Sequence, residues 1–411
     1  MNINVQRWID RWVGIPLCAA VSLMDALAKP FRSSRAVTQA DQKPRAIVVI
    51  LLSEMGSLVL AHDMFERLKT RYPDAQLHVL LFGKNREILD LMQVIPQANV
   101  HTVDDGSLLG LVGSLLKAIR DLRAAHVDVA IDCELFSRIS SLLSYFSGAS
   151  VRVGFHRHTQ EGLYRGSHIN RRVPYNPYHH ISAQFLTLAR AIDSTAVPTS
   201  KQEIALSGKP PPHVQLDPVL ISSIMQRLAN DYPAITGKPL VLVYPGGGIL
   251  PIRAWPLESY TTLCEGLVAD GCAVAVIGLK DDKALAQQLV DNVKSIAPSS
   301  TIIDLTGYTR SIAELLALFH VARLLVTNDG GPGQFAALTP IWTLMLFGPE
   351  TPALYAPLTP QCYSFYSQWP CSPCLTAYNH RSSYCDGDNQ CLKVIAPSTV
   401  LAKSRECLAS I

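Results

Sequence analysis

The spacing of apolar residues changes repeatedly along the chain from residue 45 onward. The run 46–52 is uninterrupted and rich in Ile and Val, which is typical of a strand buried on both faces of a parallel sheet. Over 58–71 the apolar residues instead recur every three or four positions, which predicts a helix. Because strand and helix continue to alternate, we predict doubly wound α/β sheets with right-handed crossovers.

Both halves of the chain show this alternation. In the first half we expect further strands at 77–82, 100–103, 127–132 and 151–155, with helices near 86–93, 108–125 and 137–147. In the second half we expect strands at 240–244, 273–278, 301–304, 324–327 and 341–347, with helices at 257–270, 281–296 and 335–338. The sequence therefore predicts two Rossmann-like domains facing a cleft, with ligands bound beyond the carboxyl ends of the strands.

The length of 411 residues agrees with two domains. We expect the first at 45–200 and the second at 238–411, which ends in a cysteine-rich tail. The stretch between them, 201–237, is rich in proline and breaks the alternation, so it is predicted to be an interdomain linker. Residues 1–44 form a separate N-terminal segment.

That N-terminal segment holds an apolar stretch, 13–28, preceded by Trp8 and Trp12 and flanked by basic residues. A signal peptide or a membrane-spanning helix is disfavoured, since the stretch is short and carries Asp25. An interfacial helix drawn to an anionic membrane, a dimerising amphipathic helix and a helix packed on its own protein remain open. Residues 33–44 are predicted to be a polar linker, so 1–44 is predicted to be an amphipathic or membrane-associating segment followed by a linker.

Composition narrows the class of protein. There are 36 Lys and Arg against 33 Asp and Glu, and a net charge of +3 is too small for a protein whose main partner is nucleic acid. No 18-residue apolar run is free of charges, which excludes a polytopic membrane protein. A charged fraction of only 17% excludes a disordered chain.

Two glycine-rich turns follow predicted strands of the second half. The first is Gly246-Gly247-Gly248, with Arg253 shortly after it, and the second lies within 328–334. Glycines at such a turn expose backbone N–H groups that can bind phosphate, and arginine adds a bidentate charge. Neither turn has the Lys-Ser/Thr of a P-loop or a G-x-G-x-x-G spacing after the first strand. The pair of turns indicates a site for a nucleotide or the pyrophosphate of a nucleotide sugar.

These motifs, in this order, resemble glycosyltransferase family 9, the ADP-heptose:lipopolysaccharide heptosyltransferases. The matching segments are Leu-Ser-x-x-Gly at 52–56, Arg-Tyr-Pro-Asp-Ala at 71–75, Arg-Val-Gly-Phe at 152–155, Pro-Gly-Gly at 245–247, Arg-x-Trp-Pro at 253–256, Leu-Thr-Gly at 305–307, Asn-Asp-Gly-Gly-Pro at 328–332 and Leu-Phe-Gly-Pro at 346–349. The resemblance implies a GT-B fold and metal-independent, inverting transfer from an ADP-heptose-like donor. It also implies a lipid-linked glycan acceptor and a cytoplasmic enzyme peripheral on the inner face of the cytoplasmic membrane.

The resemblance implies residue roles as well. For the donor it implies Gly246, Gly247, Gly248, Asn328, Asp329, Gly330, Gly331 and Gln334, with Arg253 neutralising the leaving diphosphate. The family usually has Asp-Thr-Gly-Pro-x-His where this chain has Asp329-Gly330-Gly331-Pro332-Gly333-Gln334, so donor binding is expected while donor identity stays open.

The first turn departs from the family, because Ser57 stands where the family carries the Asp thought to be the general base. A serine hydroxyl cannot accept a proton usefully without a base of its own. We therefore assign the base to Glu54 in the same loop, with His62 and Asp63 as further candidates. Gly56 and His62, with two arginines of the basic loop that follows 155, Arg157 and Arg165, are the predicted acceptor residues.

Four of the ten cysteines cluster as Cys371-Ser-Pro-Cys374, Cys385 and Cys391. They either bind one structural Zn²⁺ or remain reduced thiols that pack the tail, and both interpretations stay open. Two alternatives to the leading function also stay open. One is a GT-B transferase with a protein or capsular-polymer acceptor, and the other is a nucleotide-sugar-binding protein that has lost catalysis.

Overall fold

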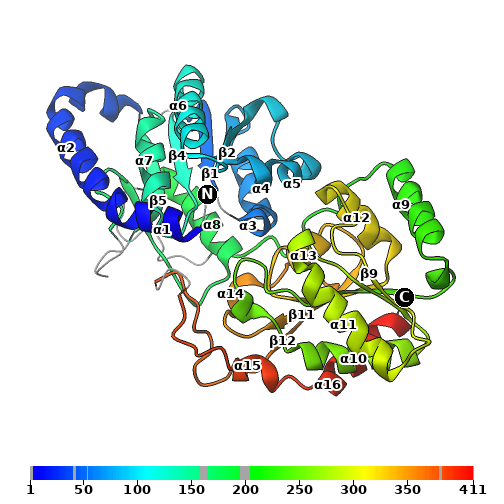
Figure 1. Cartoon of the computed structure of the whole chain (residues 1–411). Helices are drawn as coiled ribbons and strands as arrows, with labels where there is room; N and C mark the ends of the chain where they lie inside the picture. The colour runs from blue at the N-terminus through cyan, green and yellow to red at the C-terminus, as the bar shows by residue number, and fades with distance from the viewer. Residues whose placement is uncertain are drawn as a thin grey trace. The chain divides into compact units, whose positions relative to one another are not determined.

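The computed structural model describes residues 3–39, 43–52, 54–156, 164–194, 204–378 and 382–410. The chain divides into two compact units, Met1–Gly208 and Lys209–Ile411, and each is described by itself (Figure 1). Each contains one six-stranded parallel sheet. The predicted class, α/β with two Rossmann-like halves, is confirmed. In the described part of the chain, no helix combines the length and apolar character needed to cross a bilayer.

The first unit is built around a sheet of strand order β3-β2-β1-β4-β5-β6. Its strands are β1 (Ala46–Ile50), β2 (Gln76–Phe82), β3 (Val100–Val103), β4 (Val129–Asp132), β5 (Val151–His156) and β6 (Arg171–Pro174). Its α-helices are α1 (Ile3–Trp12), α2 (Gly14–Gln39), α3 (Met55–Leu60), α4 (His62–Arg71), α5 (Arg86–Met92), α6 (Leu108–Ala124), α7 (Arg138–Phe146) and α8 (Ile181–Arg190). Single 3-10 turns are η1 (Gly83–Asn85), η2 (Gln97–Asn99) and η3 (Ala191–Asp193). Helices α6 and α7 share one apolar core with strands β1, β2 and β4, and α2 lies against the outer side of α7 (Figure 1).

The second unit has a sheet of order β12-β11-β10-β7-β8-β9. Its strands are β7 (Leu240–Tyr244), β8 (Ala273–Val276), β9 (Ile302–Asp304), β10 (Leu324–Asn328), β11 (Trp342–Phe347) and β12 (Cys362–Tyr366). Its α-helices are α9 (Pro218–Asp231), α10 (Leu257–Ala269), α11 (Lys283–Ile296), α12 (Ile312–Val321), α13 (Gly331–Ala336), α14 (Pro352–Tyr355), α15 (Gln390–Lys393) and α16 (Pro397–Ala409), with 3-10 turns η4 (Pro233–Ile235), η5 (Pro251–Arg253) and η6 (Lys280–Asp282).

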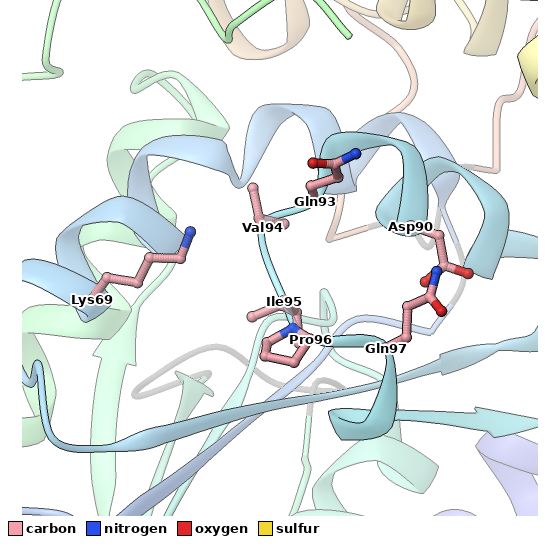
Figure 2. Close-up of a pocket in the computed structure, with 7 residues that line it drawn as sticks. All are labelled: Lys69, Asp90, Gln93, Val94, Ile95, Pro96 and Gln97. Carbon is pink, nitrogen blue, oxygen red and sulfur yellow. The ribbon is translucent and has the colours of Figure 1, made fainter. Parts of the chain in front are cut away.

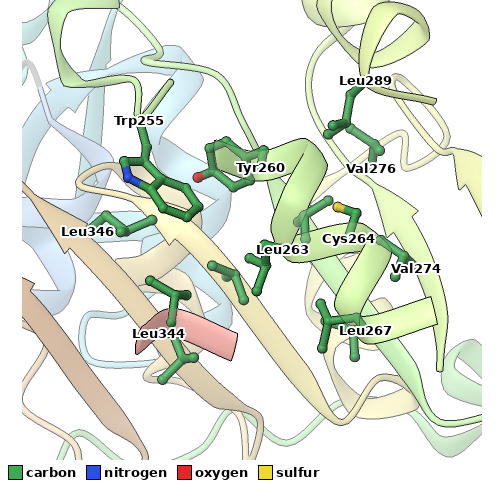
Figure 3. Close-up of a cluster of buried hydrophobic side chains, with 14 of the residues drawn as sticks. Trp255, Tyr260, Leu263, Cys264, Leu267, Val274, Val276, Leu289, Leu344 and Leu346 are labelled. Carbon is green, nitrogen blue, oxygen red and sulfur yellow. The ribbon is translucent and has the colours of Figure 1, made fainter. Parts of the chain in front are cut away.

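The core of the second unit forms where α10, α11 and α16 cover the sheet (Figure 3). Trp255 and Tyr260 meet edge to face within it, with ring centroids 5.0 Å apart. The indole N–H of Trp255 donates to the carbonyls of Leu392 and Ile395 at 3.1 and 3.2 Å, which ties the C-terminal segment to the start of α10. Burial of a large aromatic whose polar atom is satisfied stabilises both segments together.

Part of the stretch predicted to be a linker, 201–237, forms helix α9, which packs on α12 of the second unit. Asp217 caps α9 by accepting a hydrogen bond from the N–H of Val219 at 2.9 Å, and Pro218 occupies its first turn. Proline is favoured at that position, since the first N–H groups of a helix have no partner within the helix. Pro218 therefore begins a helix where the sequence analysis expected it to break one.

Candidate functional site

Each sheet reverses its strand order at one point, and that point locates the candidate site within each unit. In the first sheet the reversal lies between β1 and β4, and in the second between β7 and β10. Ligands of doubly wound sheets bind beyond the carboxyl ends of the strands at such a point. The residues that follow strands β1, β4, β7 and β10 are therefore the candidates for binding a ligand.

The turn after β1 brings Glu54 and Ser57 together. Glu54 precedes α3 with extended backbone, and the Ser57 hydroxyl donates to Glu54 Oε2 at 3.1 Å. The backbone N–H of Ser57 also donates to the Glu54 carbonyl at 3.1 Å. A hydroxyl that donates to a carboxylate favours its charged form and fixes its direction. Ser57 thus orients Glu54, and Gly56 lies between them, partly exposed.

Two residues absent from the sequence-based site hold this turn in place. The Leu52 N–H donates to Glu134 Oε1 at 2.6 Å, and its carbonyl accepts from Asn85 Nδ2 at 2.6 Å. Glu134 follows β4 and Asn85 follows β2, so the ends of three adjacent strands are tied to one another. The signal in the sequence was a polar residue two or three positions after a predicted strand.

The two further base candidates lie at the start of α4. Burial lowers the pKa of His62 below its usual value, against the opposing influence of Glu66 and Asp63, so its imidazole is neutral near neutral pH. Asp63 accepts hydrogen bonds from the backbone N–H and the hydroxyl of Ser207 at 3.0 and 2.8 Å. Asp63 therefore fastens the end of the first unit, which leaves Glu54 and His62 as the stronger candidates.

The predicted acceptor role of Arg165 is contradicted. Its side chain is fully buried, is paired with Asp132 at the end of β4, and donates to the carbonyls of Ser137 and Phe155 at 2.8 and 3.1 Å. A guanidinium committed to these partners is not a surface for a substrate, and it instead neutralises a carboxylate that burial would otherwise protonate. Arg157 lies outside the described residues.

In the second unit the glycine turn follows β7. A Cβ at Gly247 would approach the Leu250 carbonyl and Pro251 Cα to 2.7 Å, so only glycine fits there. Gly248 has φ +59°, a left-handed conformation that glycine adopts without strain. A Cβ at Gly246 would come within about 3.0 Å of the Tyr244 ring and Asp282. Local backbone geometry thus requires glycine at 247 and 248, independently of any ligand, whereas the neighbours of Gly246 are side chains.

Asn328, predicted as a donor ligand, instead clamps this turn. Its Nδ2 donates to the carbonyls of Tyr244, Pro245 and Gly246 at 3.4, 3.1 and 3.0 Å. Its Oδ1 accepts from the Trp255 N–H and the Tyr260 hydroxyl at 3.0 and 3.1 Å. Both polar atoms of this fully buried side chain are therefore committed within the unit. Asn328 therefore fixes the shape of the glycine turn.

Arg253 lies between two buried carboxylates that follow adjacent strands. Its guanidinium is 2.8 Å from Glu350 Oε1 and 3.5 Å from Asp329 Oδ2, which we name the Arg253 cluster. Burial alone would lower the pKa of Arg253, but the two carboxylates outweigh it and raise that pKa. Burial raises the pKa of both Asp329 and Glu350, although Arg253 opposes the effect at each. Two buried carboxyls facing one cation therefore hold a proton more readily than ordinary carboxyls.

Glu350 was missed by the sequence analysis, although it directly follows the recognised Leu-Phe-Gly-Pro segment. The Arg253 cluster also contains orphaned polar atoms. Among the described residues, Arg253 Nε and Asp329 Oδ2 face each other as an ion pair at 3.5 Å but have no hydrogen-bond partner despite burial. Nearby Gln334 donates to the Tyr355 carbonyl at 2.7 Å, while its Oε1 is likewise unsatisfied within the described chain. Buried unsatisfied groups are rare, and their gathering at strand ends makes this cluster the candidate for a binding site.

The cysteine tail gives no support to the zinc interpretation. Cys371 and Cys385 are exposed, Cys374 is partly buried and Cys391 is buried, and all four are free thiols. Burial, and to a smaller extent the three other cysteines, raise the pKa of Cys391 to about 11. Within the described ranges, no three His, Cys, Asp or Glu side chains are placed to hold a metal ion.

A separate hollow of about 490 Å³ lies in the first unit, lined by Lys69, Asp90, Gln93, Val94, Ile95, Pro96 and Gln97 (Figure 2). Gln97 opens η2, which leads directly into β3, so the hollow is at the amino end of that strand. It lies on the edge of the sheet opposite to the candidate site, and we assign it no part in the chemistry.

Comparisons with known proteins agree with this geometry. The family model of glycosyltransferase family 9 (heptosyltransferase) matches residues 115–384. Lipooligosaccharide heptosyltransferase 2 of Haemophilus ducreyi is 24% identical over 321 residues, which are 77% of this chain and 86% of that protein. Lipopolysaccharide heptosyltransferase 2 of Salmonella typhimurium is 24% identical over 325 residues, 76% of this chain and 85% of that protein.

Solved structures show the same fold. The ADP-heptose lipopolysaccharide heptosyltransferase II of E. coli superimposes with a TM-score of 0.68 at 21% identity, covering 89% of this chain and 99% of that one. An E. coli heptosyltransferase solved with ADP gives a TM-score of 0.57 at 14% identity, covering 88% and 99%. The two parallel sheets thus define the GT-B class of glycosyltransferases. Within that class, this chain belongs to glycosyltransferase family 9, the heptosyltransferases.

Proposed function

We propose that this protein is an inverting, metal-independent glycosyltransferase that moves a heptose or a related sugar from an ADP-sugar to a lipid-linked saccharide such as the lipopolysaccharide core. The observation that carries the proposal is the Arg253 cluster, a buried cation beside a glycine turn at the point where the second sheet reverses its order. Family membership and relatives named as lipopolysaccharide heptosyltransferases support it. Similar structures solved with ADP and with a fluorinated ADP-heptose support the donor.

For the donor, Arg253 binds the diphosphate and stabilises the negative charge that grows as the sugar departs. Asp329 and Gln334 contribute their unsatisfied oxygens to hydroxyl groups of the donor. Gly330 and Gly331 line the path by which the donor reaches Arg253. Packing within the second unit does not require glycine at these positions, because an added Cβ would meet its nearest neighbours only at 4.0 and 3.4 Å. With Arg253 in this role, the positive charge that a metal would supply comes from the chain.

For the acceptor, Glu54 accepts the proton of the attacking hydroxyl while Ser57 holds the carboxylate in direction. The hydroxyl attacks the anomeric carbon on the face opposite the diphosphate, and a single displacement of this kind inverts the configuration. Because the acceptor is carried by a lipid, we place the enzyme on the cytoplasmic side of the membrane as a peripheral protein. The domain that contains Glu54 serves the acceptor and the one that contains Arg253 serves the donor.

The test is transfer from ADP-heptose to a deacylated lipopolysaccharide core, measured by mass spectrometry with and without excess EDTA. We expect transfer by the wild-type protein in both conditions, and loss of donor binding in Arg253→Ala. Arg405→Ala is the matched control, because Arg405 also pairs with a carboxylate, Asp270 at 2.7 Å, but on the surface of the second unit.

Three outcomes would contradict parts of this proposal. ADP-heptose binding without transfer to any acceptor would favour a nucleotide-sugar-binding protein that has lost catalysis. Transfer to a protein or a capsular polymer instead of the core would replace the acceptor. Loss of activity in EDTA, restored by a divalent cation, would overturn metal independence.

A further inference from the structure

Within 14–28, helix α2 buries two polar residues and leaves several large apolar residues exposed. On its inner side, Ser22 and Asp25 are buried in the first unit beside Cys18 and Val21. Its outer side presents large apolar side chains that are 43–64% exposed: Val13 just before the helix, then Leu17, Leu23, Met24 and Leu27. Helix α1 adds Trp8 and Trp12, 59% and 60% exposed. A surface helix of a protein surrounded by water shows the reverse pattern.

The inward polar residues anchor the helix firmly. Asp25 pairs with Arg152 at 3.3 Å, with both side chains only 7% exposed. The Ser22 hydroxyl accepts from the N–H of Ser167 at 2.8 Å and donates to the Cys18 carbonyl. Because these partners are satisfied only when the inner side faces the unit, α2 cannot roll over to bury its leucines. The buried contacts of Asp25 and Ser22 therefore keep the apolar side of α2 exposed.

Helix α1 is fixed in the same manner. Asp10 accepts hydrogen bonds from the backbone N–H groups of Arg138 and Ile139 at 2.8 and 3.0 Å, where α7 begins. It also lies 3.4 Å from the Arg138 guanidinium, whose side chain is 2% exposed. A carboxylate at a helix N-terminus is stabilised both by free N–H groups and by the helix dipole. The two helices thus form one attached body on α7 (Figure 1).

Basic residues outnumber acidic ones in the sequence of the two helices. Residues 1–39 hold five basic residues, Arg7, Arg11, Lys29, Arg32 and Arg35, and two acidic ones, Asp10 and Asp25. Both acidic residues are the inward anchors just described, so they are committed to arginines of the first unit. An apolar surface with tryptophans and an excess of basic residues complements an anionic lipid surface.

We propose that the α1–α2 surface, defined by Trp8, Trp12, Val13, Leu17, Leu23, Met24 and Leu27, lies in the interface of an anionic membrane, parallel to it. This inference deepens the proposed function, since it names the surface through which the enzyme meets the membrane that carries its acceptor. A second copy of the chain is the competing occupant, and the vesicle experiment below distinguishes it from the membrane.

The experiment compares the full chain with two double variants in sedimentation with vesicles. Leu23→Glu/Leu27→Glu changes the α1–α2 surface, while Val219→Glu/Ile296→Glu is the control and changes two residues of the second unit that are 71% and 64% exposed. Vesicles contain phosphatidylcholine with or without phosphatidylglycerol. We expect the first variant to lower the partition coefficient at least about tenfold, and the control to leave it unchanged.

All four substituted residues are exposed, so both variants should unfold at the wild-type temperature, which is checked first. Wild-type binding should also need phosphatidylglycerol and weaken in salt. Undiminished vesicle binding by Leu23→Glu/Leu27→Glu overturns the proposal. So does a wild-type dimer that this variant converts to a monomer without any vesicle binding.

Transfer to the deacylated, soluble core separates this inference from the proposed function. Transfer by a protein that ignores vesicles would mean that the function holds and the α1–α2 surface does not bind lipid. Vesicle binding that depends on α2, without any transfer, would mean that the α1–α2 surface binds lipid and that the proposed function is wrong. Deleting 1–35 is a weaker test, because it leaves the buried Arg138 and Arg152 without their carboxylates.

Discussion

Ser57 lies three residues after Glu54 and donates to its carboxylate. In the proposed mechanism Glu54 accepts the proton and Ser57 orients Glu54. We predict that Glu54→Gln lowers kcat by roughly 10²–10⁴-fold with donor affinity kept, because it removes the proton acceptor. Ser57→Ala should lower kcat far less, since only one hydrogen bond to Glu54 is lost. Steady-state kinetics with the soluble acceptor measure both.

The reverse ranking of these two variants would mean that Ser57 acts with a base other than Glu54. If both variants keep full activity, the neutral imidazole of His62 becomes the candidate, and His62→Gln is the variant to measure next.

Asn328 gives a second prediction at the scale of the residue, and it concerns stability. Asn328→Ala removes the acceptor of the Trp255 N–H and a donor to the carbonyls of Pro245 and Gly246, while the Tyr260 hydroxyl and the Tyr244 carbonyl keep their mutual hydrogen bond. We therefore expect the free energy of unfolding to fall by roughly 3 kcal/mol. Urea denaturation measures this. Asn292→Ala is the control, because that partly exposed side chain makes one long hydrogen bond of 3.4 Å to Thr261, and its loss should be nearly neutral. A neutral Asn328→Ala would contradict the role of Asn328 as a clamp.

The carboxyls of the Arg253 cluster predict a pH dependence. Because burial raises the pKa of Glu350 in the folded protein, folding takes up a proton. The stability that this proton gives is present at low pH and is lost as the pH rises from the ordinary value of 4.5 through the raised pKa. In Glu350→Gln, the free energy of unfolding should therefore fall less steeply over that range, by at most about 1.4 kcal/mol per pH unit. Parallel curves for the two proteins would contradict the assignment.

Sequence analysis located Arg253, Asp329 and the glycine turn because those residues follow predicted strands. It could not separate a residue that contacts a ligand from one that holds the loop, since both occur at strand ends. Asn328 was assigned to the donor because it follows a predicted strand, and Arg165 to the acceptor because it lies in a basic loop. The structure instead commits their polar atoms to carbonyls and a carboxylate within their units. Glu350 was overlooked because its importance depends on the proximity of Arg253, 97 positions earlier in the chain.

At the scale of elements, the central strands and two edge strands, β3 and β9, were predicted, whereas the edge strands β6 and β12 were not. Strands β1 and β7 are buried along their whole length and therefore appear as continuous apolar runs. Edge strands β6 and β12 have a neighbour on one side only, and their sequences, Arg-Arg-Val-Pro and Cys-Tyr-Ser-Phe-Tyr, contain no such run. An edge strand needs less apolar surface, and a proline such as Pro174 is tolerated there.

Helix α2 gives a prediction at this scale, because its attachment is ionic and buried. Removing one partner leaves a buried charge alone, so we expect Asp25→Ala to lower the free energy of unfolding by about 3 kcal/mol. Arg152→Met should cost more than the ion pair alone, because Arg152 also donates to the buried carbonyls of His168 and Ala149 at 2.6 and 2.8 Å. In the double variant Asp25→Ala/Arg152→Met, the loss should be smaller than the sum of the two single losses, since no charge is left without its partner. Urea denaturation of the single variants and the double variant measures the coupling. Additive losses in the double variant would show that the pair contributes nothing as a pair.

At the scale of the whole molecule, the two units repeat one topology. Both sheets place six parallel strands in the order 3-2-1-4-5-6 when numbered within the unit, and each unit has its own buried core. All residues of the Arg253 cluster lie in the second unit. We predict that residues 209–411 alone fold and bind ADP but transfer no sugar, because Glu54 is absent.

Calorimetry and a thermal shift with ADP test this last prediction, since a ligand that binds only the folded state raises the unfolding temperature. The same fragment with Arg253→Ala is the control and should show no shift. A folded fragment that ignores ADP would move the nucleotide site away from the second unit.

The outward leucines of α2 also affect how this protein should be handled at the bench. An apolar patch exposed to water promotes self-association as the protein concentration rises. The buried Asp25–Arg152 pair prevents α2 from turning its leucines inward. Preparations without additives should therefore precipitate or elute as broad, heavy species in gel filtration. A mild detergent, or a lipid nanodisc with anionic headgroups, would shield Leu23 and Leu27 and keep the enzyme dispersed. Leu23→Glu/Leu27→Glu would achieve the same without detergent, which makes it the form best suited to crystallisation.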